Sequence, residues 1–189
     1  MLEQFIPRPD MQDRRQITIR APAAMVLEVA RNFDLQSIFL IRTIFWLRAK
    51  MLGARTETAP RRLGLVADML GMGWGRLAEE RNHFFVAGAA CQPWRAHVVF
   101  SRIPPEQFAA FAEPDQVKIA WTLEVEALEP ALTRFATETR AVATDDQARK
   151  KFLRYWQAFG IGALLIRRLL LPALRRQGER RWQAASPVA

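Results

Sequence analysis

Residues 117–127 read VKIAWTLEVEA, and in this stretch apolar and polar side chains alternate. The apolar positions are Val117, Ile119, Trp121, Leu123 and Val125. A period of two places successive side chains on opposite faces of a β-strand. We therefore predict a strand here with one face buried in a core and the other face in water.

Shorter segments of the same kind lie on both sides of this strand. Turn residues separate them, among them a Pro104–Pro114 excursion and a Glu129-Pro130 turn. The short connections are typical of antiparallel strands. The predicted additional strands are residues 16–20, 75–80, 84–90, 96–101 and 132–142.

Helical patterns follow the first predicted strand. Pro22 suits the first turn of a helix because its missing N–H is not needed there. Residues 35–52 form a second predicted helix with apolar side chains in every sector, and Arg42 near its centre argues against a membrane span. We expect that helix to cover a core. Residues 53–63 are typical of a loop, and residues 63–70 of one or two helical turns.

A long helix is predicted at the C-terminal end of the chain. The sequence Thr144-Asp145-Asp146-Gln147 has the form of a capping box, with Thr144 as the cap. We expect the glycines around residues 160–162 to weaken or bend the helix, and Pro172 to kink or restart it. The order of elements predicts an α+β fold: a curved antiparallel sheet wrapped around the C-terminal helix, with short helices between the first and second strands.

Length and charge narrow the class of protein. The chain has 189 residues, enough for one domain, and we expect an irregular lead-in at 1–14, one domain at 15–182 and a tail at 183–189. The formal charge is +9, and residues 140–182 carry eleven cations against three acids. One cysteine and the lack of a visible signal peptide favour a cytoplasmic location.

Several stretches resemble the START-like superfamily (SRPBCC, the helix-grip fold), and in particular a group of small bacterial proteins of unknown role within it. The resemblance covers roughly residues 15–181. It rests on the opening strand leading into Ile19-Arg20-Ala21-Pro22, and on Leu77-Ala78-Glu79-Glu80, Phe108-Ala109-Ala110-Phe111, Lys118-Ile119-Ala120-Trp121, Thr137-Glu138-Thr139-Arg140, Phe152-Leu153-Arg154-Tyr155-Trp156 and Leu165-Ile166-Arg167-Arg168.

The resemblance implies a cavity between the sheet and the long helix that holds an apolar molecule. It implies no particular reaction, because the superfamily includes lipid carriers, hormone receptors, ring-hydroxylase domains and cyclases. The leading hypothesis is therefore binding of a small hydrophobic or lipid-like molecule, for transport or sensing, with no cofactor.

Candidate ligand-binding residues are the aromatic side chains that we expect on the concave side of the sheet, together with a polar pair. Glu138 and Arg140 are two residues apart and so share one face of the last strand. If that face lines the cavity, the pair is a polar anchor or an acid–base group; otherwise it is a structural ion pair. The aromatic candidates are Trp94, Phe108, Phe111, Trp121, Tyr155, Trp156 and Phe159.

The sequence offers no catalytic residue with a supporting pattern. His97 and Cys91 are conceivable as base and nucleophile, but no acid stands at a recognisable spacing to orient the histidine. With His83, they form no pair at metal-binding spacing either, so we predict no metal site.

The basic helix leaves alternatives open. One is a peripheral membrane protein that meets the anionic inner face of the membrane through Arg167, Arg168, Arg175 and Arg176. Another is an enzyme of the cyclase or dehydratase kind, which requires that Glu138 titrates abnormally inside the cavity. We expect no nucleic-acid partner, because no binding motif accompanies the charge. The oligomeric state is left open.

Overall fold

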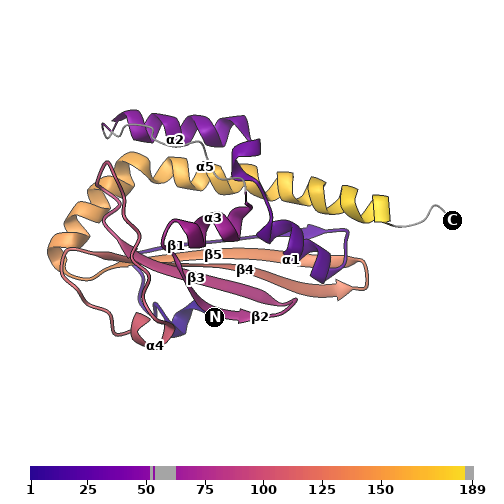
Figure 1. The fold of residues 1–189 in the computed structure, drawn as a ribbon, viewed down its shortest axis with the longest axis horizontal. Coiled ribbons are helices and arrows are strands. Elements are labelled where there is room, and N and C mark those ends of the chain that lie inside the picture. The colour runs from indigo at the N-terminus through magenta and orange to yellow at the C-terminus, as the bar shows by residue number, and fades with distance from the viewer. Residues whose placement is uncertain (52, 54–62, 186–189) are drawn as a thin grey trace.

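A computed structural model describes residues 1–51, 53 and 63–185. Its strands lie in one sheet, and its longest helix forms the C-terminal end of the fold (Figure 1). In chain order, the elements are η1 (Leu2–Gln4), β1 (Met11–Ile19), α1 (Ala23–Arg31), η2 (Leu35–Ser37), α2 (Phe39–Met51), α3 (Leu65–Gly71), β2 (Gly75–Glu80), β3 (Phe84–Cys91), α4 (Pro105–Phe108), β4 (Val117–Glu129), β5 (Leu132–Ala143) and α5 (Asp146–Ala185).

The sheet has five antiparallel strands in the order β1-β5-β4-β3-β2. Helix α5 runs along one face of it (Figure 1). This confirms the predicted α+β architecture, an antiparallel sheet that grips a long C-terminal helix. Strand β4 is central in the sheet, and Trp121 pairs with Thr139 on β5 and Ala87 on β3.

We call the face of the sheet turned toward α5 the inner face. It carries the larger core, in which Trp121, Leu123 and Phe135 pack against residues of α1, α3 and α5. The apolar positions of β4 therefore face the helices, as their spacing predicts.

The other face, the outer face, is not left to water along its whole length, which corrects the prediction of one wet face. Phe108 of α4 and the N-terminal residues Leu2, Phe5 and Ile6 cover it in a second core cluster. As a result Lys118 and Thr122 of β4 are buried, while Glu126 beyond the cover is exposed.

Three predicted boundaries are corrected. Strand β1 begins at Met11, and the lead-in before it packs into the outer core because Leu2 and Ile6 are apolar. Residues 96–101 are not a strand, since Ser101 alone makes an isolated bridge, to Ala90. Helix α5 continues to Ala185, and the predicted tail beyond it falls outside the described residues.

The N-cap of α5 is Asp145 and not Thr144. The Asp145 carboxylate accepts hydrogen bonds from the Ala148 amide at 2.7 Å and from the Asp115 amide at 2.6 Å. The Thr144 hydroxyl instead bonds to the backbone of Gln116: it accepts from the Gln116 amide and donates to the Gln116 carbonyl. Amide hydrogen bonds to the Asp145 carboxylate hold its pKa below the ordinary value of 3.8.

Helix α5 is continuous through its glycines and through Pro172, so the predicted restart does not occur. The ribbon rises from the sheet in its first part and then turns to run along the sheet (Figure 1). Gly162 serves another purpose: a Cβ there would lie 3.1 Å from Ile44 Cγ2, so the missing side chain lets α2 approach α5 closely.

Helix α2 does not cover the core, contrary to the expectation from its apolar sequence. It packs on α5, with α5 between it and the sheet (Figure 1). Of the α2 side chains that the structure describes, Ile41 is the one that is fully buried. In α2, the apolar side chains on every side of the helix therefore leave an exposed apolar surface and are not all buried in a core.

Candidate ligand site

Helix α5 is attached to the sheet near its two ends. At its start Phe152 packs with Val117 and Ala141 on the inner face. Toward its end Leu170, Leu171 and Leu174 enter the main core, and Gly178 lies against Ile19. Between these anchors, within residues 153–169, Gly160 is the one fully buried position. The middle of α5 is thus less buried than its two ends, and Arg167 within it pairs with Asp13 of β1.

Below this span, aromatic side chains gather at the start of the helix. Tyr155 and Phe159 stack with their ring centroids 5.1 Å apart, and Phe152 lies 6.2 Å from Trp156. A Cβ on Gly160 would come within 2.8 Å of the Trp156 ring, so that glycine makes room for the indole. Trp94 packs against the same cluster from the loop after β3.

The inner face also carries polar groups in register below α5. Asp13, Thr139 and Trp121 stand side by side on β1, β5 and β4. Directly opposed residues on adjacent strands have Cβ atoms about 4.5–5.5 Å apart. Asp13 is ion-paired with Arg15 of its own strand and with Arg167 of α5.

Two buried indole N–H groups in the main core have no hydrogen-bond acceptor among the described residues. They belong to Trp121 on β4 and Trp74 just before β2, whose residues are 7% and 5% exposed. Leaving a buried donor unpaired costs about 1–3 kcal/mol. Unpaired groups of this kind are uncommon in folded proteins, and a bound molecule with an accepting oxygen is one way to pair them.

The predicted ligand residues divide between the two faces of the sheet. Trp94, Trp121, Tyr155, Trp156 and Phe159 lie on the inner side, with α5. The other four are on the outer side, which corrects the expectation that all the aromatic candidates face the concave side: Phe108, Phe111, Glu138 and Arg140.

Glu138 and Arg140 form a buried structural network. The Glu138 carboxylate accepts hydrogen bonds from Arg140 Nε at 2.6 Å, Gln12 Nε2 at 2.8 Å and Arg14 Nη1 at 3.0 Å. Arg140 also donates to the Ile6 carbonyl at 3.1 Å and so ties the N-terminal segment to the sheet.

The charge state of Glu138 follows from these bonds. Burial alone would raise the pKa of Glu138, but hydrogen bonds from Arg140, Arg14 and Gln12 outweigh it, and the pKa lies below its ordinary value of 4.5. A carboxylate held ionised in this way is a poor proton donor. Glu138 also lies on the outer face, which contradicts the expectation that it stands inside a cavity below α5.

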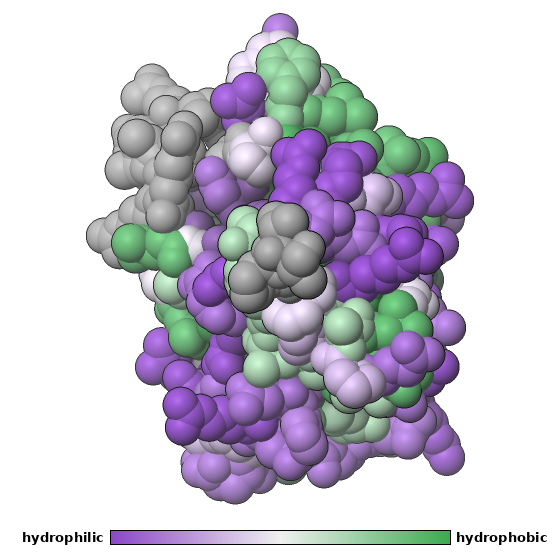
Figure 2. Space-filling model, turned by 90° about the vertical axis from the view of Figure 1, so that its right-hand side faces the viewer, coloured by the Kyte–Doolittle hydropathy of each residue, from purple (hydrophilic) through white to green (hydrophobic). Residues whose placement is uncertain are grey.

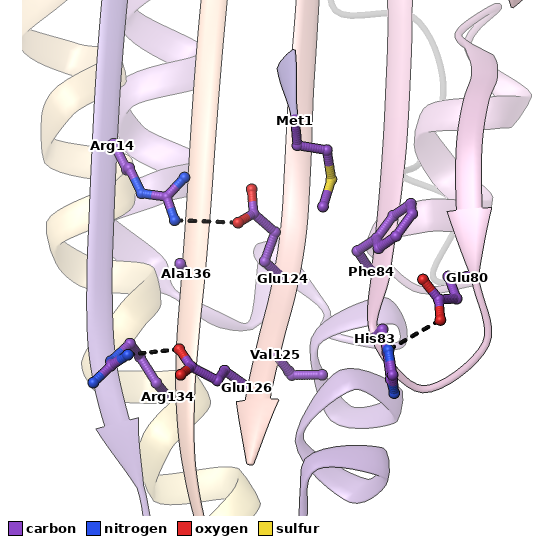
Figure 3. A pocket seen from close by; sticks show the side chains of 10 residues that line it. All are labelled: Met1, Arg14, Glu80, His83, Phe84, Glu124, Val125, Glu126, Arg134 and Ala136. Atoms are coloured by element: carbon purple, nitrogen blue, oxygen red, sulfur yellow. Dashed lines mark hydrogen bonds and ion pairs between the residues drawn. The ribbon is translucent and has the colours of Figure 1, made fainter. Parts of the chain in front are cut away.

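A small hollow of about 170 Å³ lies on the outer face, near the β2–β3 turn (Figure 3). Its charged side chains are already paired with one another: Arg14 with Glu124, Arg134 with Glu126, and His83 with Glu80. A charged ligand would therefore have to displace an existing ion pair, which makes this hollow a weaker candidate than the inner side.

Cys91 and His97, the two residues considered for catalysis, lie in different environments. Cys91 is buried at the end of β3. His97 lines an open hollow of about 320 Å³ with Arg95 and Gln116.

The arginines of α5 do not form one free basic stripe. Arg167 points to the sheet and pairs with Asp13, and its side chain is 14% exposed. Arg175 Nε lies 3.0 Å from Glu179 on the same helix. Arg168 and Arg176 are exposed. Leu170 and Leu174, which lie between these arginines in the sequence, are buried in the core.

Sequence reasoning missed Trp74 and Asp13. Trp74 lies within the glycine-rich segment 71–75, and its ring packs on Phe100, with the ring centroids 5.1 Å apart. Asp13 lay in the predicted lead-in. Residues 12–16 of β1 are all polar, so the sequence gave little signal of a buried face there.

Helix α5 is long and apolar enough to cross a bilayer by length and composition, with a best window of mean hydropathy 1.4 that is 22% buried. Its contacts with the sheet at both ends place it in the fold instead.

Comparisons with known proteins add little. The sequence matches no protein-family model and no curated protein. The crystal structure of Zhui aromatase/cyclase from Streptomyces sp. R1128 is similar over 94% of this chain and 99% of that chain, with 14% identity and a TM-score of 0.32. A similarity at this level does not bear on function.

Proposed function

We propose that the protein binds an amphipathic small molecule between the inner face of the sheet and the middle of α5. The molecule has an apolar body and at least one oxygen that accepts a hydrogen bond. The observation that carries this proposal is the pair of buried indole N–H groups of Trp121 and Trp74, which find no acceptor in the described part of the chain.

The apolar body of the ligand would contact the less buried middle of α5, residues 153–169. Tyr155, Trp156 and Phe159 are half-buried, so part of the surface of each side chain is exposed. Burying apolar surface contributes about 25 cal/mol per Å² before the costs of binding. Flat or acyl skeletons both suit such a lining of rings.

The accepting oxygen is matched to the indoles. A ligand oxygen that accepts from Trp121 or Trp74 removes the cost of a buried unpaired donor, and a hydrocarbon of the same shape does not. Because Trp121 lies beside Thr139 in the register, a hydroxyl group stands next to the same position. The proposal is one of binding, and it assigns no reaction.

The first test is native mass spectrometry of gently purified protein, together with thermal unfolding in the presence of fluorenone or fluorene. These two probes share one flat skeleton and differ by a carbonyl oxygen. We expect an adduct or stabilisation, and a tighter complex with fluorenone. The absence of any adduct and of any stabilisation would overturn the proposal.

The second test separates the indole N–H from the ring. The variant Trp121→Phe keeps an aromatic side chain and loses the donor. We expect the affinity for fluorenone to fall about fivefold to tenfold, as for one lost hydrogen bond, and the affinity for fluorene to stay the same. The matched control is Trp46→Phe on α2, where the tryptophan is 54% exposed. Equal losses for both probes would show that the N–H is not used.

A further inference from the structure

We propose that the exposed surface formed by α2 and the middle of α5 docks on an anionic lipid bilayer. We call this surface the α2–α5 face. It is defined by the exposed apolar side chains Phe39, Leu40, Trp46, Leu47, Met51, Ile161 and Leu165. The proposal does not depend on the ligand site, because it concerns the opposite side of the same helix pair.

The apolar side chains of this face are too exposed for a surface left in water. Phe39 and Ile161 are 71% and 69% exposed, and Met51 is 62% exposed. Figure 2 shows apolar side chains along the top of the molecule, where α2 and α5 lie, above a band of hydrophilic ones. Isolated apolar residues on a surface are ordinary, but a group of them on two adjacent helices marks an interaction site.

Cations accompany the exposed rings. The Arg42 guanidinium lies 5.4 Å from the centroid of the Phe39 ring, and Lys50 Nζ lies 5.1 Å from that of Trp46. Helix α2 contains no acidic residue, and neither do residues 147–178 of α5. Arg154 and Arg168 are exposed on that part of α5.

This combination fits the surface of an anionic membrane. Interfacial helices carry Trp, Phe and Leu on one side and Lys or Arg beside them, so that the rings enter the headgroup region while the cations meet lipid phosphates. Each Lys or Arg held near an anionic leaflet strengthens its attraction.

A second copy of this chain fits less well. In a two-fold symmetric dimer the same patch meets itself, which would bring Arg42 and Lys50 of one copy against those of the other with no acid on the face to compensate. An anionic bilayer instead supplies the missing negative charge. The position of α2 agrees, because it is the outermost layer of the fold on that side (Figure 1).

The test is co-sedimentation of the full chain, with no added ligand, with two kinds of vesicle. One is pure phosphatidylcholine, and the other is phosphatidylcholine mixed with phosphatidylglycerol. We expect binding to the mixed vesicles that weakens as salt is raised, and little binding to the neutral ones. Failure to bind mixed vesicles at low salt would overturn the proposal and leave the ligand site untouched.

Apolar variants test the contact itself. The triple variant Phe39→Gln, Leu47→Gln, Ile161→Gln changes exposed side chains, so folding is expected to survive. We expect its binding to mixed vesicles to fall roughly tenfold or more. The matched control, Met72→Gln with Val99→Gln, also replaces exposed apolar residues but off this face, and it is expected to bind like the wild type. Equal binding by the triple variant and the wild type would overturn the proposal.

Charge variants separate local from general attraction. Arg42→Glu with Lys50→Glu is expected to weaken binding about tenfold or more. Arg8→Glu with Arg81→Glu changes the net charge equally, and these exposed residues lie away from α2, so a much smaller loss is expected. Equal losses would mean that overall charge alone drives adsorption, which contradicts docking through this face.

The oligomeric state in lipid-free solution is the last readout. We expect a monomer by light scattering, for the wild type and the triple variant alike. A wild-type dimer that the triple variant dissociates would assign this face to self-association and overturn the membrane proposal.

Discussion

At the scale of single residues, buried polar groups on the two faces of the sheet differ in their hydrogen bonding. On the outer face Glu138 is surrounded by donors, and each of its oxygens is used. On the inner side the indole N–H groups of Trp74 and Trp121 have no acceptor within residues 1–51, 53 and 63–185. A polar group that is fully paired inside the protein stabilises the fold, and one that is unpaired is available to a ligand.

The charge state of Glu138 gives a prediction for stability against pH. Its pKa is lowered in the folded protein, so the folded state favours the carboxylate. The resulting stability is present above the ordinary value of 4.5 and is lost as pH falls through that value toward the lower folded one. We expect the free energy of unfolding, measured with urea at a series of pH values, to fall in this acid range.

The variant Glu138→Gln checks the assignment. It leaves Arg140 buried without its carboxylate partner, so at neutral pH we expect a loss of about 2 kcal/mol or more, with a flatter acid dependence. The control is Glu126→Gln, which breaks an exposed pair with Arg134 and is expected to cost less than about 1 kcal/mol. Equal effects of the two variants would contradict the buried network.

At the scale of elements, periodicity predicted the strands well and the environment of α2 poorly. The alternation in β4 reports which side chains share a face, because that follows from the geometry of a strand alone. The apolar sequence of α2 reports only that the helix avoids water on several sides. Whether protein or another phase provides that environment depends on where α5 lies, which residues 39–51 do not encode.

The attachment of α2 to α5 rests on a small residue. Gly162 lies under Ile44, so the variant Gly162→Leu is expected to push α2 away from α5. The measurement is hydrogen–deuterium exchange, which should become faster in residues 39–51 and stay unchanged in the sheet. The control is Gly71→Leu at the end of α3, where a Cβ meets no atom within 4 Å. Unchanged exchange in α2 would show that Gly162 does not control the packing of this helix.

At the scale of the whole molecule, the sheet separates two tasks. Its outer face is covered in part by the N-terminal segment and α4, and its inner face carries the proposed ligand site. The sequence could predict the sheet and its partner helix but not this cover. Residues 1–10 contain two prolines and show no strand or helix period, because apart from the short helix η1 they pack as an irregular segment against the outer face. The unpaired indoles are equally hidden, since pairing is decided by contacts across the fold.

This separation predicts that stability and ligand binding respond to different substitutions. Ile6 is 1% exposed in the outer core, so Ile6→Ala is expected to lower the free energy of unfolding by about 2–4 kcal/mol, through lost burial and the cavity left behind. Its affinity for fluorenone, measured below the unfolding transition, should equal that of the wild type because Ile6 lies on the far side of the sheet from α5. Trp121→Phe should instead lower that affinity with a smaller effect on urea unfolding. If Ile6→Ala weakened fluorenone binding as much as Trp121→Phe does, the two faces would be coupled, and the ligand site could not be assigned to the inner face alone.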